Sequence, residues 1–235
     1  MKLNVAYDFL PKQRSLHTSL VMDHFGVQFD HERHVIAEEV ELSLQPGQVV
    51  LFIGPSGSGK SSLLRATQQA LAQQGQRVLE VERLTWPMRP LVDAFDQPLS
   101  DVLPWLSGCG LGEAQLMLRT PQELSEGQRY RFKLALGLSR LARQAAGQSA
   151  WLAADEFTAT LDRVLAQVVA YNVQRLARKQ GLGLLLATTH EDVQMDLQPE
   201  VIVRCDLQQP VQVEHAGKAA PPVPRQPIHF FPLAG

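Results

Sequence analysis

The stretch that decides the fold is residues 54–62, which read GPSGSGKSS. They follow an apolar run, residues 49–53 (VVLFI), which predicts a buried strand, and they precede residues 63–66 (LLRA), which open a helix. The order glycine, four residues, glycine, lysine and serine fits the phosphate-binding loop. Glycines let successive backbone N–H groups face one anion, and the helix start adds a partial positive charge there. The stretch therefore predicts a nucleotide-phosphate site.

Two residues of this loop carry chemistry of their own. Lys60 would bridge the β- and γ-phosphates of a nucleotide, and the Ser61 hydroxyl would ligate Mg²⁺. The alternative is a glycine turn that binds nothing. The strand before the loop and the predicted helix after it, residues 60–74, favour the phosphate site.

The composition is that of an ordinary globular protein. Its 235 residues indicate one large domain or a domain with a small insertion, and 45% of them are hydrophobic. The net charge of −2 gives no general attraction to nucleic acid or acidic membranes, but it allows a local basic patch. Two distant cysteines, Cys109 and Cys205, indicate a reducing compartment without a disulfide framework.

Neither end of the chain predicts a membrane segment. No stretch approaches the ~18 apolar residues that a spanning helix needs, and the first residues lack a signal-peptide core. We therefore expect a cytoplasmic protein, and a partner would supply any membrane span. Residues 216–235 are rich in proline and predict a flexible tail after a domain of residues 1–215.

An antiparallel piece is predicted ahead of the phosphate loop. Residues 19–29 and 35–44 both alternate between apolar and polar side chains, which favours two strands with a turn between them. Phe25 and Phe29 lie on this piece, and either could stack on an adenine ring. Core packing explains Phe25 better, so Phe29 is the candidate for adenine.

The region after the loop is less regular. Residues 77–81 predict a short strand, and residues 85–122 contain five prolines with short helical patches at 99–106 and 113–118. With the long helix that follows, we interpret about residues 85–146 as a small inserted helical subdomain.

The segment Leu124, Ser125, Glu126, Gly127 and Gln128 precedes that long helix. Ser125 is a good N-cap, and Gln128 stands three positions later, as a capping box requires. The segment therefore offers another helix N-terminus, with a hydroxyl and free N–H groups. Because such caps are common, this pattern alone is a weak functional signal.

A buried strand, residues 150–154, ends in two acids. An acid at the carboxyl end of a parallel strand beside a phosphate loop is where Mg²⁺ is held, which suits Asp155. Glu156 would polarise the attacking water. The alternative is that the acids cap the next helix.

Two further polar residues stand at element ends. Asp162 starts an amphipathic helix that runs to about residue 180, where it is a cap or a nucleotide contact. His190 follows the apolar strand at residues 182–187, and it could contact a γ-phosphate or order a water. A lone histidine more often has a structural role.

Taken in order, these motifs resemble the ATP-binding-cassette (ABC) ATPases. Residues 54–62 resemble the Walker A loop, residues 124–128 the LSGGQ signature, and residues 152–156 Walker B with the catalytic glutamate. Residues 157–162 are similar to the D-loop, and His190 to the switch histidine. The resemblance covers about residues 19–205, and it implies an α/β P-loop NTPase with a mostly parallel central sheet, an antiparallel β-subdomain and a short helical subdomain.

The resemblance also implies an Mg²⁺-dependent ATPase that works as a head-to-tail dimer, either of two identical chains or with a related ABC domain. Each ATP would lie between Walker A of one subunit and the signature of the other, so that neither site is complete in a monomer. The catalytic candidates are Lys60, Glu156 and His190, and the metal candidates are Ser61, Gln97 and Asp155. The candidates for nucleotide contacts are Phe29, Gly54, Pro55, Ser56, Gly57, Ser58, Gly59, Lys60, Ser61, Ser62, Ser125, Gly127, Gln128 and Asp162.

The sequence departs from the family pattern at two points. Glu126 replaces a glycine of the signature, and a carboxylate near a triphosphate is unfavourable unless it points away. The usual glutamine loop is not evident, which leaves Gln97, with Gln122 as the other candidate. The helical segment that in transporters grips the membrane partner is also short.

Three functions compete. The first is a soluble, non-transport ATPase that switches a protein or nucleic-acid partner, since residues 124–132, 155–157 and 187–190 resemble a soluble ABC-type group, sometimes fused to an acetyltransferase-like domain. A basic face on the signature helix would serve nucleic acid. The second is the nucleotide-binding subunit of a membrane transporter. The third, a non-enzymatic binding module, is disfavoured because Lys60, Glu156 and His190 are all present.

Overall fold

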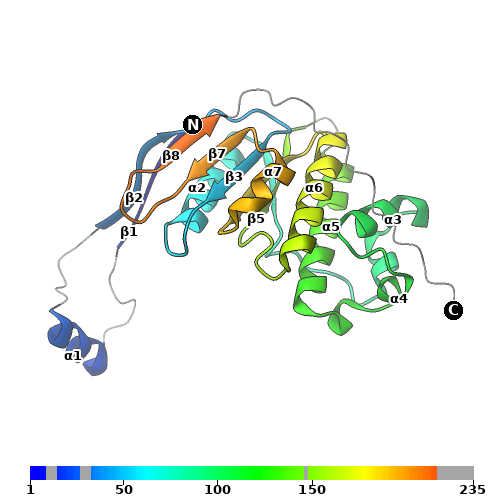
Figure 1. The fold of residues 1–235 in the computed structure, drawn as a ribbon, viewed down its shortest axis with the longest axis horizontal. Coiled ribbons are helices and arrows are strands. Elements are labelled where there is room, and N and C mark those ends of the chain that lie inside the picture. The colour runs from blue at the N-terminus through cyan, green and yellow to red at the C-terminus, as the bar shows by residue number, and fades with distance from the viewer. Residues whose placement is uncertain (9–14, 27–32, 146–147, 216–235) are drawn as a thin grey trace.

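The computed structural model describes residues 1–8, 15–26, 33–145 and 148–215 of the chain (Figure 1). A six-stranded sheet runs through the molecule in the order β4-β5-β6-β3-β7-β8, and only the β7–β8 pair is antiparallel. Its strands are β3 (Val49–Ile53), β4 (Arg77–Glu80), β5 (Ala150–Ala154), β6 (Gly183–Thr188), β7 (Val201–Arg204) and β8 (Gln212–His215). The mostly parallel central sheet that the sequence predicts is confirmed.

A separate two-stranded sheet pairs β1 (Lys2–Asp8) with β2 (Arg33–Glu41) in antiparallel fashion. The predicted antiparallel piece is thus present, but its first strand was wrong. The chain forms α1 (Leu16–Phe25) where a strand was expected, because Ser15 and Thr18 build a capping box and Gly26 ends the helix in the left-handed conformation. Phe25 is 72% exposed, so core packing does not explain it. Phe29 lies outside the described residues.

The helices cover both faces of the central sheet (Figure 1). All five residues of β3 are buried, and they alternate between two apolar clusters, one on each face. Leu63, Leu64 and Leu71 of α2 pack on one face with β1 and β2, and α3, α5 and α6 pack on the other. The helices are α2 (Lys60–Gln73), α3 (Leu99–Gly108), α4 (Ala114–Met117), α5 (Glu126–Gln144), α6 (Arg163–Lys179) and α7 (Gln194–Leu197), with 3-10 turns at Leu91–Phe95, Pro121–Glu123 and Glu191–Val193.

The helical region after β4 contains α3, α4 and α5, so both short helical patches that the sequence predicts are confirmed. Its limits at residues 85–146, within a domain of residues 1–215, stay predictions. Among the described residues, none of the helices combines the length and the apolar character that crossing a membrane requires.

Close packing between β5 and β6 provides a test of this fold. A methyl group at Gly183 would collide with the indole ring of Trp151, which is fully buried. We expect Gly183→Ala to lower the free energy of unfolding by about 1–3 kcal/mol, since overpacking displaces the ring. The control is Gly112→Ala, where a methyl group meets only ordinary contacts and should change stability by less than about 0.5 kcal/mol. Equal urea midpoints for the two variants would contradict this packing.

Candidate functional site

Parallel pairing brings the predicted site residues to one edge of the sheet. β3 pairs with β6, and β6 pairs with β5, all in the same direction. The segments that leave these strands therefore start side by side: the phosphate loop after Ile53, the two acids after Ala154 and His190 after Thr188. This is the edge at which open α/β sheets bind ligands.

The phosphate loop depends on glycines at three positions. Gly54, Gly57 and Gly59 all have positive φ angles, of 147°, 81° and 87°. A methyl group at Gly54 would also collide with the Cys205 carbonyl oxygen, and one at Gly59 with the Ile36 side chain. The loop is therefore held tightly against β7 and the antiparallel sheet, and larger residues cannot replace these glycines.

The inside of the loop has unused polar groups that fit a phosphate. The Ser58 hydroxyl oxygen is buried and has no hydrogen-bond partner among the described residues. No side chain caps the start of α2, so its first N–H groups are available. Lys60 Nζ donates to the Pro55 carbonyl at 2.6 Å, and burial lowers the pKa of Lys60. A phosphate would give this half-desolvated cation a stronger partner than a carbonyl.

Ser61 and Asp155, two of the predicted metal ligands, are in direct contact. Ser61 Oγ donates a hydrogen bond of 3.0 Å to Asp155 Oδ1, which joins the first turn of α2 to the end of β5. Hydroxyl and carboxylate oxygens are the hard ligands that Mg²⁺ prefers. These two residues therefore fit the Mg²⁺ ion that the sequence resemblance implies, and they lie next to the phosphate loop.

Sequence reasoning missed Glu82, which lies directly against Asp155. Its carboxylate oxygen Oε1 accepts a hydrogen bond of 2.8 Å from the Asp155 backbone N–H. Burial is the main cause that raises the pKa of Glu82, and the charge of Asp155 adds to it. Glu82 directly follows the strand predicted at residues 77–81, but only the structure shows that this strand, β4, pairs with β5. Glu82 is an acid at a fourth strand end of the same sheet edge, beside the ends of β3, β5 and β6.

Gln97 is placed elsewhere. Its side-chain oxygen accepts a hydrogen bond of 3.2 Å from Ser139 Oγ in the helical region. Among the described residues, no hydrogen bond joins Gln97 to Ser61 or Asp155. Its metal role stays a prediction without a contact in its favour, and Glu82 is the residue that the structure brings to Asp155.

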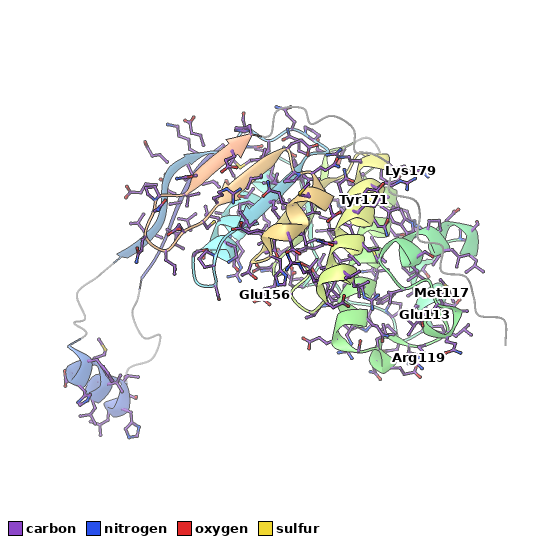
Figure 2. All side chains as sticks on the ribbon, viewed as in Figure 1. Glu113, Met117, Arg119, Glu156, Tyr171 and Lys179 are labelled. Carbon is purple, nitrogen blue, oxygen red and sulfur yellow. The ribbon has the colours of Figure 1, made fainter. Side chains whose placement is uncertain are left out.

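The turn after β5 is conformationally unusual. Glu156 and Thr158 adopt positive φ angles of 49° and 67°, which are uncommon for residues other than glycine and especially so for a β-branched threonine. Glu156 is exposed at the edge of the sheet, and Figure 2 labels it there. Thr158 is fully buried. Such backbone conformations persist where the surroundings hold them, which here places the exposed Glu156 carboxylate next to Asp155.

His190 and Asp162 have fewer contacts. The His190 backbone N–H donates to Thr188 Oγ1, and its half-buried imidazole makes no hydrogen bond to any residue that the structure describes. Asp162 Oδ1 accepts from the Leu165 N–H at 3.0 Å and caps α6. The capping role of Asp162 is confirmed, and its nucleotide contact stays a prediction.

The signature segment forms the capping box that the sequence predicts. Ser125 Oγ accepts from the Gln128 N–H, and Gln128 Oε1 accepts from the Ser125 N–H. Ser125 and Glu126 are exposed, so the carboxylate that departs from the family pattern is in solvent. Gly127 lies so close to the Thr160 carbonyl that a methyl group would be 3.0 Å away. Within the described chain, no hydrogen bond connects residues 124–128 to the phosphate loop.

The basic face that the sequence suggested for α5 consists of side chains that are paired within the chain. Each of its cations donates to a backbone carbonyl oxygen of the same chain, so these side chains have a structural role within the chain. The pairs are Arg129 with Pro121 and Leu124, Arg131 with Gly127 and Gly110, Lys133 with Glu82, Arg140 with Thr85, and Arg143 with Phe95.

A glycine-rich phosphate loop after β3, an acid at the end of β5 and a serine-capped signature helix define a P-loop nucleotide-hydrolysing domain. The ABC transporter family model matches residues 37–90. The zinc import ATP-binding protein ZnuC of Pseudomonas putida is 30% identical over 197 residues, which cover 77% of this chain and 72% of that protein. The chain therefore belongs to the ABC family of ATPases.

Two further comparisons agree. The aliphatic sulfonates import ATP-binding protein SsuB 1 of Xanthomonas axonopodis is 29% identical and covers 81% of this chain and 82% of its own length. The dimeric structure of MJ0796, a bacterial ABC transporter cassette, has a TM-score of 0.61 and 17% identity, and it covers 91% of this chain and 97% of its own. At that identity the likeness shows the fold.

The metal site yields a prediction that needs no catalysis. We expect Asp155→Asn to weaken Mn²⁺ binding at least about tenfold in the presence of a non-hydrolysable ATP analogue, because an amide replaces an anionic ligand. Electron paramagnetic resonance of free Mn²⁺ measures this loss. Asp101→Asn, at an exposed position of α3, is the control and should bind Mn²⁺ as the wild type does. Unchanged Mn²⁺ affinity in Asp155→Asn would remove Asp155 from the metal site.

Proposed function

We propose that this chain binds Mg²⁺ and ATP at the edge of its parallel sheet, hydrolyses the ATP in a head-to-tail dimer, and serves as the ATP-binding subunit of a membrane import system. The observation that carries the site is the Ser61–Asp155 hydrogen bond, which puts the phosphate loop and the strand-end acid in contact. The unpaired Ser58 hydroxyl and the free start of α2 support a phosphate between them.

Each residue has a stated task. The N–H groups of residues 56–62 and the Lys60 side chain hold the β- and γ-phosphates, and Gly54, Gly57 and Gly59 permit that backbone shape. Ser61 and Asp155 hold Mg²⁺, which supplies charge neutralisation between those phosphates. Glu156 accepts a proton from the attacking water, and His190 orients the water or the γ-phosphate.

The dimer completes the site. Ser125, Gly127 and Gln128 start α5 away from any contact with the phosphate loop of their own chain, and Ser125 is exposed. A second helix N-terminus is a natural cap for the outer side of a triphosphate. We assign that cap to the partner subunit's signature. ATP then links the two subunits, and hydrolysis releases them.

The partner is assigned from the relatives. The similar proteins are named as ATP-binding subunits for import of zinc and aliphatic sulfonates, which favours a membrane permease over the soluble switch that the short helical region suggested. The internally paired cations of α5 remove the observation that favoured nucleic acid. Experiment can distinguish a transporter subunit from a soluble switch, and a homodimer from a heterodimer.

Hydrolysis and dimer formation can be separated with one substitution. We expect Glu156→Gln to lower kcat at least about a hundredfold, since it removes the general base, while ATP and Mg²⁺ then trap a dimer. Phosphate release and size-exclusion chromatography measure the two effects. Glu113→Gln, an exposed glutamate of the helical region, should match the wild type (Figure 2). A wild type without phosphate release, or a variant that stays monomeric in ATP, would refute the proposal.

The partner proposal has its own test. The Glu156→Gln protein should be recovered from native cells with a protein of several membrane spans when ATP is present, and much less of it without ATP. Mass spectrometry of the purified complex identifies the companion. Recovery with only soluble proteins, from both the membrane and the soluble fractions, would instead support the soluble switch.

A further inference from the structure

Tyr130 of the signature helix has a buried hydroxyl without a task in the site described so far. It lies on the second turn of α5, just after the Ser125 cap. The phenol oxygen is buried and has no hydrogen-bond partner among the described residues. Burying an unpaired hydroxyl costs about 1–3 kcal/mol, so a phenylalanine at this position would be the more stable choice for a purely structural role.

The groups that influence this hydroxyl belong to the sheet edge that carries the proposed ATP site, which we call the catalytic edge. The carboxylates of Glu82 and Asp155 and the backbone amide of Thr158 all act on Tyr130, although the amide lacks the geometry of a hydrogen bond. Burial is the main cause that raises the pKa of Tyr130 well above its usual value, so the phenol keeps its proton and is a donor. The hydroxyl is therefore a donor that no described residue accepts, and the charges of Glu82 and Asp155 contribute to the raised pKa of Tyr130.

Helix α5 contacts Glu82 through another residue, Lys133. Lys133 Nζ donates to the Glu82 carbonyl at 3.0 Å and also lies over the Trp86 ring, at 5.0 Å from its centroid. Because Tyr130 and Lys133 are three residues apart, they lie on one face of α5. The start of this helix is also tight against the turn after β5, where Gly127 meets the Thr160 carbonyl. A movement of the signature would therefore displace Glu82 and the turn after β5.

We propose that Tyr130 is a positioning residue, whose hydroxyl donates to the Glu82 carboxylate in the ATP-loaded dimer and so aligns Asp155 with the signature helix of the same chain. The inference rests on the proposed ATP site. Glu82 already accepts the Asp155 N–H, and its carboxylate has further lone pairs for a second donor. The signature caps one nucleotide and Asp155 holds the metal of the other, so this contact links the two sites of the dimer.

The substitution Tyr130→Phe tests this assignment. We expect kcat for ATP to fall about tenfold, which is about 1.4 kcal/mol of transition-state stabilisation, with KM within about twofold. The melting temperature of the nucleotide-free protein should stay the same or rise, because an unpaired buried hydroxyl is removed. In the Glu156→Gln background, adding Tyr130→Phe should reduce the rise in melting temperature that Mg²⁺ and ATP cause.

Tyr171→Phe is the matched control. Tyr171 lies on α6, away from Glu156 (Figure 2), and its phenol is half-buried. It should leave kcat and the nucleotide-induced stabilisation unchanged. A Tyr130→Phe variant with wild-type kcat, or one whose nucleotide-free melting temperature and kcat both fall, would overturn the assignment, since the second result describes simple packing.

A double-mutant cycle decides whether Tyr130 acts through Glu82. In the Glu82→Ala background the effect of Tyr130→Phe on kcat should vanish, whereas Glu82→Gln, which keeps an oxygen acceptor, should preserve it. Additive effects in the Glu82→Ala background would refute the contact. The outcome is separable from failure of the proposed function, because a wild type that releases no phosphate defeats the ATPase assignment before any variant is compared.

Discussion

The site depends on the hydrogen bond between Ser61 and Asp155, which joins the first turn of α2 to the end of β5. The bond exists because β3, β6 and β5 run parallel and finish at one edge of the sheet. A hydroxyl donor and a carboxylate acceptor at this distance are also the two oxygen ligands that a bound Mg²⁺ would take over. The fold thus brings together the two side chains to which the proposed metal site is assigned.

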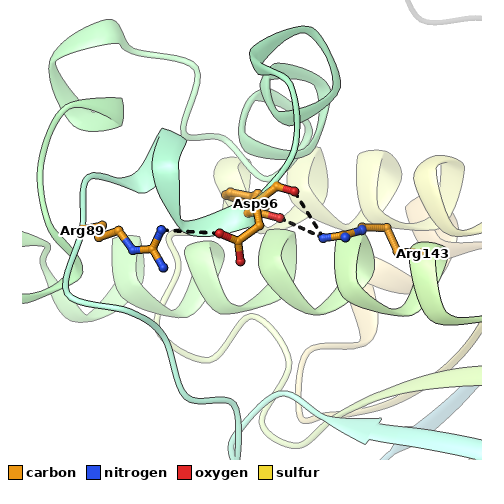
Figure 3. A network of polar contacts seen from close by, with 4 residues as sticks. Arg89, Asp96 and Arg143 are labelled. Carbon is orange, nitrogen blue, oxygen red and sulfur yellow. Dashed lines mark hydrogen bonds and ion pairs between the residues drawn. The ribbon is translucent and has the colours of Figure 1, made fainter.

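The signature helix has a second role beyond its exposed N-terminus. Three cations of the helix, Lys133, Arg140 and Arg143, donate hydrogen bonds to backbone carbonyl oxygens between Glu82 and Asp96. This segment leads from the edge of the sheet into the helical region. Figure 3 shows the far end of this connection, where Arg143 reaches the Asp96 carbonyl oxygen and Arg89 pairs with the Asp96 carboxylate at 3.4 Å. Asp96 itself has a positive φ angle of 51°. These cations, which the sequence suggested as contacts for nucleic acid, thus bind backbone carbonyl oxygens of their own chain.

Local signals were strong enough to predict much of the fold. The glycine spacing of residues 54–62, the capping box of Ser125 and Gln128, and the acids after β5 each depend on a few neighbouring residues, and the helices and strands around them are confirmed. The family follows from their order. Helix α1 was missed because loose alternation was given more weight than the cap at Ser15 and the glycine at 26.

Tertiary placement could not be predicted from the same signals. Glu82 becomes part of the site only because β4 pairs with β5, and the sequence does not say which strands are neighbours. Gln97 was chosen by residue type, but the chain carries it to Ser139. The side chain of Tyr130 has no motif at all. The role proposed for it depends on the packing of α5 against β4 and β5, which brings the helix to Glu82.

The central claim is that ATP lies between two copies of this chain, and a structure of the Glu156→Gln protein with Mg²⁺ and ATP tests it most directly. The account predicts a two-fold dimer in which each triphosphate touches Lys60 of one subunit and Ser125 of its mate, with the metal ion between Ser61 and Asp155. A nucleotide bound in a monomer, or a dimer in which Ser125 contacts no nucleotide, would contradict it.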